Sequence, residues 1–151
     1  MANTTFSGPV RSENGFQDIT KNATTGAVTT NSTYGNNAAV GGTLTVTGAT
    51  TLTGGMVGGV QEITGAGAVD LTTLVTEITT DSADAFTLAD GTQGQMKIIV
   101  GVDVSSGDAT LTPATFANGT TITFDAAGEA VTLVYTASGW NVVGINGATV
   151  A

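Results

Sequence analysis

Apolar residues alternate with threonine through much of the carboxy-terminal part of the chain. In TTITFDAAGEAVTLVYTASGWNVVG, residues 120–144, every second position of two successive runs is apolar. A period of two is typical of a β-strand with one buried face. Glycine-containing turn signals separate such runs, in LADGTQGQ, SSGDA, FANGT, DAAGE and TASGW. Short strands joined by such turns predict an antiparallel β-sandwich or small barrel.

The predicted strands and core can be stated by residue. Strands are expected at residues 68–79, 85–88, 95–104, 109–111, 120–124, 131–136 and 140–145. The last three should form an antiparallel meander of two hairpins. The expected core consists of Ile98, Val100, Ile122, Phe124, Val131, Leu133, Tyr135, Trp140, Val142 and Ile145.

A different pattern occupies residues 41–58, where GGTLTVTGATTLTGG places glycine at Gly42, Gly48 and Gly54. Between the glycines, Leu44, Val46 and Leu52 share the segment mainly with threonine. Two hexads are too short to bury apolar side chains within one chain, because repeats need neighbours to close a core. We therefore expect three copies to wind around a common axis with these three side chains inward. The alternative is a flexible Gly/Thr linker.

Residues 1–40 form a third region, with sparse apolar side chains set among Asn, Thr, Ser and Gly. So few apolar groups cannot offset the roughly 1–2 kcal/mol per residue needed to fix a backbone. Pro9 and the glycines also disfavour a regular element. This arm is either disordered or ordered by a partner surface. The predicted organisation is thus an arm (1–40), a repeat (41–58) and an all-β domain (59–151).

Charge and composition narrow the classes of function. The chain has 3 Lys and Arg against 12 Asp and Glu, a formal net charge of −9. Phosphate contacts need clustered basic residues, so the charge argues against nucleic acid and against an anionic membrane surface as partners. The acidity suits a protein that stays soluble at high concentration, or one that binds a basic patch on a protein partner. The first twenty residues contain no apolar run that could act as a signal-peptide core, which predicts a protein made in a cytoplasm.

Candidate chemistry is weak throughout the sequence. There is no Cys or His, which removes thiolate metal sites and the commonest general base. The acidic residues Asp81, Asp84, Asp90, Asp103 and Asp108 lack the spacing of a calcium loop and are explained by turn chemistry. Glu77 and Glu129 could serve a two-carboxylate glycosidase, but aromatic sugar platforms are scarce. We therefore predict no enzyme, no catalytic, cofactor or metal residues, and no cofactor.

Two stretches resemble known proteins. MANTTFSGPVRSENGF, residues 1–16, resembles the amino-terminal segment of virion structural proteins of marine tailed phages, particularly those of cyanobacteria. The region from VDLTTLVTEIT through ADAFTLADGTQGQMKIIV to GWNVVGINGATVA resembles a β domain of head-decoration and fibre-like proteins of such phages. TLTVTGATTLTG is similar to repeats of trimeric phage fibres.

The resemblance implies a homotrimer on the outer capsid surface of a virion, made in the host cytoplasm. The chain is short for a fibre, which favours a capsid decoration (cement) protein that binds the major capsid protein and stabilises the mature shell. Its expected capsid-binding anchors are Phe6, Pro9, Val10, Arg11, Phe16 and Ile19, and its expected trimer contacts are Leu44, Val46 and Leu52. The alternative is a head or tail fibre, a receptor-binding adhesin that recognises a host glycan or surface protein. A fibre tip that degrades polysaccharide is the third hypothesis.

Overall fold

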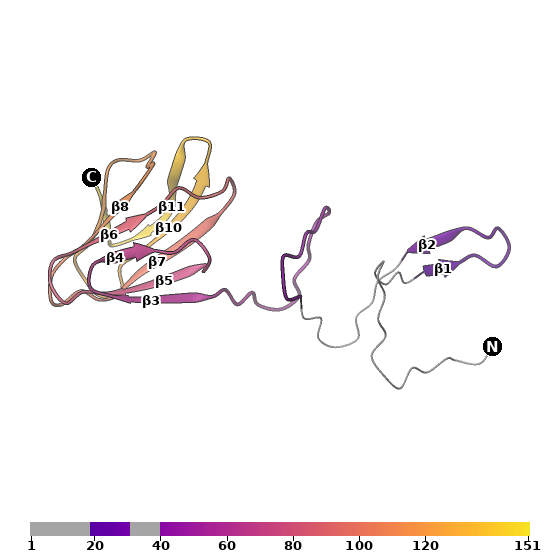
Figure 1. Cartoon of the computed structure of the whole chain (residues 1–151), viewed down its shortest axis with the longest axis horizontal. Coiled ribbons are helices and arrows are strands. Elements are labelled where there is room, and N and C mark those ends of the chain that lie inside the picture. Colours follow the sequence, from indigo (N-terminus) through magenta and orange to yellow (C-terminus); the bar gives the residue numbers. More distant parts are fainter. Residues whose placement is uncertain (1–18, 31–39) are drawn as a thin grey trace, which may run out of the picture. The chain divides into compact units, whose positions relative to one another are not determined.

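The computed structural model describes residues 19–30 and 40–151, and the chain divides into two compact units, Met1–Thr51 and Leu52–Ala151. The described residues contain only strands and irregular segments, so the all-β prediction is confirmed. The strands are β1 (Ile19–Lys21), β2 (Val28–Thr30), β3 (Val60–Thr64), β4 (Gly67–Val69), β5 (Val75–Thr79), β6 (Asp84–Leu88), β7 (Met96–Asp103), β8 (Ala109–Pro113), β9 (Ile122–Phe124), β10 (Ala130–Thr136), β11 (Gly139–Asn146) and β12 (Thr149–Val150) (Figure 1).

The first unit contains a small antiparallel hairpin, β1–β2, where the sequence was expected to form no regular element. Its turn is stabilised by Asn22, whose side-chain oxygen accepts the N–H groups of Thr24 and Thr25 at 2.8 and 2.9 Å. Gly26 supplies the positive φ of 70° that closes the turn. Local turn chemistry therefore forms a hairpin that the sparse apolar content did not predict.

The second unit is built from two mixed five-stranded sheets that enclose one core and are not closed into a barrel. Sheet I has the strand order β11-β10-β7-β5-β3, and sheet II has the order β12-β9-β8-β6-β4. From β3 to β8 each successive strand lies in the other sheet, so the chain winds as a coil of three stacked turns. Strands of the same sheet in successive turns are parallel, as in β3–β5–β7 and β4–β6–β8.

The prediction of an antiparallel domain is therefore wrong for this coil. A parallel pair needs a crossover between its strands, and here the strand in the opposite sheet is that crossover. Within the two five-stranded sheets, only the pairs that involve β9 to β12 are antiparallel. The β10–β11 hairpin confirms half of the predicted meander. The other hairpin is wrong, because β9 lies in sheet II between β8 and β12.

Two strand boundaries also differ from the prediction. The single strand expected over 68–79 is two strands, β4 and β5, which belong to different sheets and are joined by a connection through Asp70. The short strands β3 and β12 were not predicted at all. Glycine and small residues around β3 and β12 weakened the local strand signal, and only pairing with β5 and β9 fixes them.

The core confirms most of the predicted residues, including the fully buried Trp140, whose indole N–H donates to the Ala89 carbonyl at 2.9 Å. For β7, the prediction placed the wrong set of alternate side chains in the core. Ile98 and Val100 lie on the outer face, whereas Ile99 and Lys97 are buried with no exposed surface. Ile145 is also outside the core, with 47% of its surface exposed.

Candidate assembly surfaces

The glycine hexads bend the chain at a regular interval. Residues 40–59 contain no strand in the single chain, and bends fall at residues 41–42, 47–48 and 53–54, each including one of the hexad glycines. A Cβ built on any of these three glycines would meet no atom within 4 Å. Close packing against the described residues is therefore not the reason for glycine at these positions.

The three predicted trimer contacts are uncovered in the single chain. Leu44 is 69% exposed, Val46 51% and Leu52 62%. Leu44 and Val46 belong to the first unit and Leu52 to the second, so each side chain is described only within its own unit. Water contact of three apolar side chains within one short segment is unfavourable unless another surface covers them.

The predicted capsid-binding anchors are not tested by the structure. Phe6, Pro9, Val10, Arg11 and Phe16 lie outside the described residues. Ile19 is the first residue of β1. Their role in binding a capsid therefore stays a prediction.

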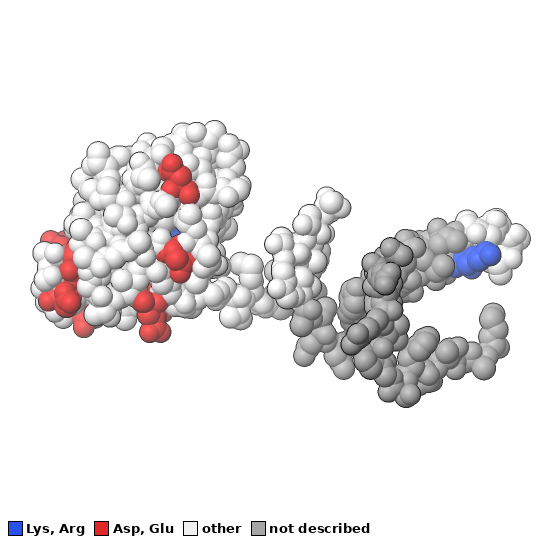
Figure 2. All heavy atoms as spheres, viewed as in Figure 1, with Lys and Arg blue, Asp and Glu red and all other residues white. Residues whose placement is uncertain are grey.

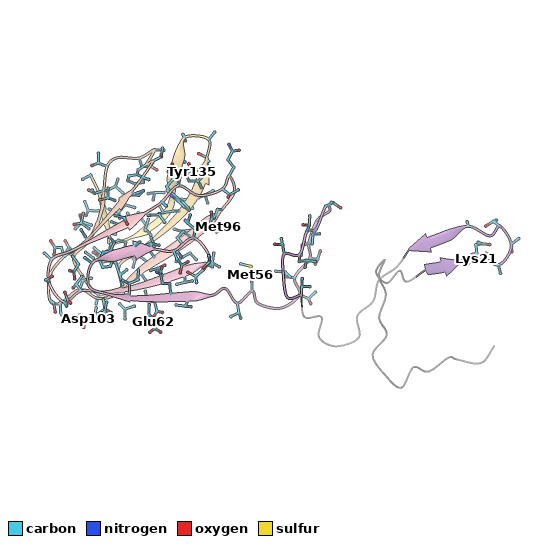
Figure 3. The ribbon with its side chains drawn as sticks, viewed as in Figure 1. Lys21, Met56, Glu62, Met96, Asp103 and Tyr135 are labelled. Atoms are coloured by element: carbon cyan, nitrogen blue, oxygen red, sulfur yellow. The ribbon has the colours of Figure 1, made fainter. Side chains whose placement is uncertain are left out.

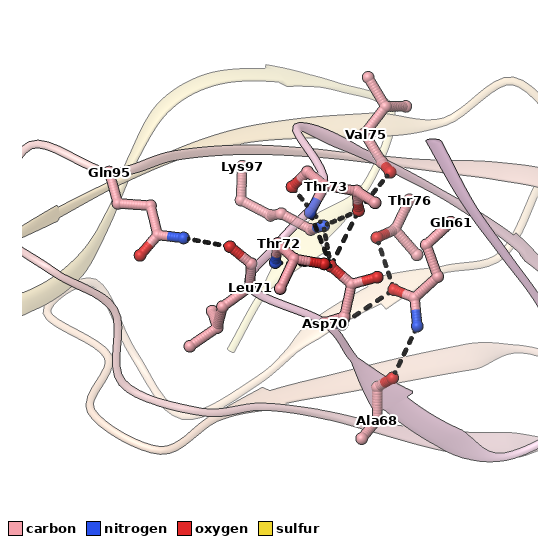
Figure 4. A network of polar contacts seen from close by, with 10 residues as sticks. All are labelled: Gln61, Ala68, Asp70, Leu71, Thr72, Thr73, Val75, Thr76, Gln95 and Lys97. Atoms are coloured by element: carbon pink, nitrogen blue, oxygen red, sulfur yellow. Dashed lines mark hydrogen bonds and ion pairs between the residues drawn. The ribbon is translucent and has the colours of Figure 1, made fainter. Parts of the chain in front are cut away.

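A polar network fixes the connection between β4 and β5 (Figure 4). The Oδ1 atom of Asp70 accepts the N–H groups of Thr72 and Thr73, both at 2.8 Å. Lys97 lies on the inner face of β7, and its ammonium donates to the carbonyl and hydroxyl oxygens of Thr73 at 2.9 and 2.8 Å. The same ammonium lies 3.7 Å from Oδ1 of Asp70. The side-chain oxygen of Gln61 in β3 accepts the Asp70 N–H at 2.8 Å and the hydroxyl of Thr76 in β5 at 3.0 Å, so it ties β3 to the next turn of the coil.

The charges of this network are set by its surroundings. Burial raises the pKa of Asp70, but hydrogen bonds from Thr73 and Thr72 and the charge of Lys97 outweigh it and lower the pKa to about 2. Burial lowers the pKa of Lys97, and Asp70 opposes that shift. No buried side-chain nitrogen or oxygen in the described residues lacks a hydrogen-bond partner, so the buried lysine is a structural group that anchors a loop. The sequence analysis did not predict this role, because the partners of Lys97 lie 24 and 27 residues away in the chain.

Two glutamates meet on the outer face of sheet I. Glu62 of β3 and Glu77 of β5 are neighbours in the parallel register. They line an open recess of about 270 Å³ together with Ile63, Thr64, Thr79 and Val102. Side chains directly opposite on adjacent strands lie about 5 Å apart, and like charges there are destabilising. Glu129, the other carboxylate considered in the sequence, instead accepts the N–H of Asp125 in a turn.

Acidic residues in the turns accept hydrogen bonds from backbone N–H groups close by in the sequence. Asp84 is buried and accepts the N–H groups of Asp81 and Ser82 at 3.0 and 3.3 Å. Burial raises its pKa, and these hydrogen bonds, with one from the Ser82 hydroxyl, lower it overall. Asp103 likewise accepts the N–H of Ser105 at 2.9 Å. No group of three or more metal-ligating side chains occurs in residues 19–30 and 40–151.

Charge is unequally divided between the units. Ten of the twelve acidic residues and only one basic residue, the buried Lys97, lie in residues 52–151, whereas Arg11 and Lys21 lie in the first unit. Figure 2 shows acidic side chains in several places on the face of the domain in view.

In the described part of the chain, no helix is long and apolar enough for a membrane crossing. No known family model matches the chain, and no curated protein sequence is significantly similar to it.

Proposed function

We propose that this chain is a non-enzymatic virion protein, a homotrimeric capsid decoration protein that binds the outer surface of a phage head. The observation that carries the proposal is the exposure of Leu44, Val46 and Leu52 in a segment that bends every six residues. A lone chain leaves these side chains in water, and three copies around an axis would bury them against one another.

The division of charge supports a protein with two different tasks. The domain of residues 52–151 is rich in acidic residues, and such a charge favours solubility and opposes association of separate trimers. The first unit carries Arg11 and Lys21 beside only Glu13 and Asp18, and so lacks that repulsion. Three arms on one trimer bind a shell far more tightly than one, because the second and third contacts become intramolecular.

The abundance of the protein in the virion tests its role. We expect quantitative mass spectrometry of purified virions to give a molar ratio to the major shell protein of the same order as one. A ratio of a few per cent would contradict decoration and favour the alternative, a fibre or receptor-binding adhesin.

Charge substitutions in the repeat test its role separately. Leu44→Asp with Leu52→Asp should shift the mass measured by light scattering from trimer to monomer. Thr45→Asp with Thr53→Asp is the matched control, since it adds the same charge one position away along the same segment. A trimer that survives the leucine substitutions would show that the repeat does not hold the copies together.

A further inference from the structure

The two sheets of the domain present outer faces of different chemistry. The outward positions of sheet II are Ala68, Ala85, Thr87, Thr110, Thr112, Thr123 and Thr149. They are short and hydroxylated or methyl-bearing, as expected of a solvated face. On sheet I the outward positions along β7, and several on the strands beside it, are apolar: Val60, Val75, Met96, Ile98, Val100, Val102, Ala130 and Val134. The other outward positions of β3, β5 and β10 are polar: Glu62, Thr64, Glu77, Thr79, Thr132 and Thr136.

The register of the strands makes the apolar positions of sheet I contiguous. Val60 lies beside Val75, and Val75 beside Ile98, across β3, β5 and β7. In the same sheet, Val100 faces Ala130 and Met96 faces Val134. Three of these side chains stand well out in water, with Val60 51%, Met96 46% and Val102 48% exposed.

We propose that this outer face of sheet I is the surface on which the domains of neighbouring copies pack, so that the homotrimer continues beyond the glycine repeat. The inference rests on the proposed function in one respect, the existence of an assembly of identical copies. It adds which surface of the domain that assembly buries.

Continuity along the chain points to a second copy as the occupant. Residues 52–59 lead directly into β3, the edge strand of sheet I (Figure 1). Met56 and Val57 of this segment are 68% and 97% exposed, and Met56 projects freely from it in Figure 3. From Leu52 to Val60 the chain spans at most about 28 Å. Copies gathered through Leu52 therefore hold their β3 edges within that distance of the common axis.

The chemistry of the face also fits an identical copy. Interfaces with unrelated proteins are usually anchored by Tyr, Trp or Arg, and none of these occupies an outward position on the patch. Valine, isoleucine and methionine on a flat sheet are instead typical of obligate interfaces, which resemble a domain core cut in half. Glu77 lies beside Val100 in the strand register and Glu62 lies beyond it on the edge strand β3, and both line an open recess where water can still screen them.

The size of the patch indicates how the interface must be built. A strand spacing of about 4.8 Å and a side-chain repeat of about 6.7 Å give roughly 30 Å² of sheet for each outward position. The apolar positions therefore cover about 250 Å² of sheet, less than the roughly 800 Å² per partner of a standard interface. The face alone is too small, and the adjoining segment with Met56 and Val57 must be buried with it.

Substitutions that turn one face into the other test the proposal in the full chain. Ile98→Thr with Val100→Thr gives sheet I the chemistry of sheet II, and Thr110→Ala with Thr112→Ala is the control on sheet II. By sedimentation equilibrium, the first variant should raise the trimer dissociation constant at least about 100-fold, and the control should leave it unchanged. Near-ultraviolet circular dichroism of Trp140 reports whether each variant keeps its core.

Thiol labelling gives a second readout that needs no disruptive change. The chain has no cysteine, so Val100→Cys and Thr110→Cys each carry one thiol, at positions of similar partial exposure in the single chain. In the assembled protein, maleimide should react with Val100→Cys at least about tenfold more slowly than with Thr110→Cys. Equal labelling rates would overturn the proposed packing.

The outcomes separate this inference from the proposed function. A wild-type trimer that the sheet I variant leaves equally tight overturns the packing inference and leaves decoration standing. A trimer that depends on sheet I but is rare in virions supports the packing and contradicts decoration. A monomeric wild-type chain overturns both the packing and the homotrimer.

Discussion

The Asp70–Lys97 network predicts a defined loss of stability in acid. Replacing Asp70 with Asn retains an acceptor for the N–H groups of Thr72 and Thr73 but removes the negative charge beside the buried Lys97. The folded-state pKa of Asp70, about 2, lies below its ordinary value of 3.8. Ionised Asp70 therefore stabilises the fold above about pH 4, and this contribution is lost as the pH falls towards 2.

The magnitude follows from the size of that fall. A change from 3.8 to about 2 corresponds to at most about 2.5 kcal/mol. The Asp70 side chain is 32% exposed, so solvent screening reduces the contribution to about 1–1.5 kcal/mol. Asp70→Asn should be less stable than the wild type by that amount at pH 6, and the two proteins should converge near pH 2.

Urea unfolding followed by Trp140 fluorescence measures this difference at each pH from 2 to 6. Other carboxylates titrate in both proteins and cancel in the comparison. Asp108→Asn is the control, because no hydrogen bond to the Asp108 carboxylate occurs among the described residues. A stability difference for Asp70→Asn that stays constant over this pH range would refute the electrostatic reasoning.

Three further predictions concern the fold and the arm. Lys97→Met should lower the free energy of unfolding by about 2–4 kcal/mol, because it leaves the Thr73 carbonyl and Asp70 without their ammonium partner; a loss below about 1 kcal/mol in urea unfolding would contradict the anchoring role. Gly139→Ala should lower the free energy of unfolding by about 2–4 kcal/mol, because φ is 101° and the new Cβ would lie 2.5 Å from the Thr115 carbonyl oxygen. Gly94→Ala, at a φ of 86° but in open space, should lower it by only about 1–2 kcal/mol. Equal thermal destabilisation of the two variants would exclude the clash as the cause. Deleting residues 1–40 should leave the Trp140 unfolding transition unchanged and abolish co-sedimentation with capsids; undiminished binding would rule out the arm as the clamp.

The sequence contains one signal for the parallel coil. VQEIT at residues 60–64 and VTEIT at 75–79 differ at one position and stand fifteen residues apart. In the structure they are β3 and β5, paired in parallel register with Glu62 beside Glu77 and Ile63 beside Ile78. A repeat of this kind predicts stacked equivalent strands. Turn signals alone favoured hairpins, because a tight turn does not reveal whether the next strand returns in the same sheet.

The sequence by itself determined the local properties of this protein. Alternation and turn glycines specified an all-β domain, the β10–β11 hairpin and most of the buried core, because strand period and turn chemistry are set by neighbours along the chain. It also determined the acidic charge and the glycine hexads, whose apolar side chains are too few to form a core within one chain. These properties need no knowledge of what lies across the sheet.

The tertiary structure alone decided which sheet each strand joins and which face of β7 turns inward. Ile98 and Ile99 are equally apolar, so the sequence pattern could not decide which of the two faces the core. Asp70 and Thr73, which are distant in sequence from Lys97, provide the partners of its buried ammonium. A buried charge requires partners across space, and those partners fixed the phase that leaves Ile98 and Val100 on the outer face.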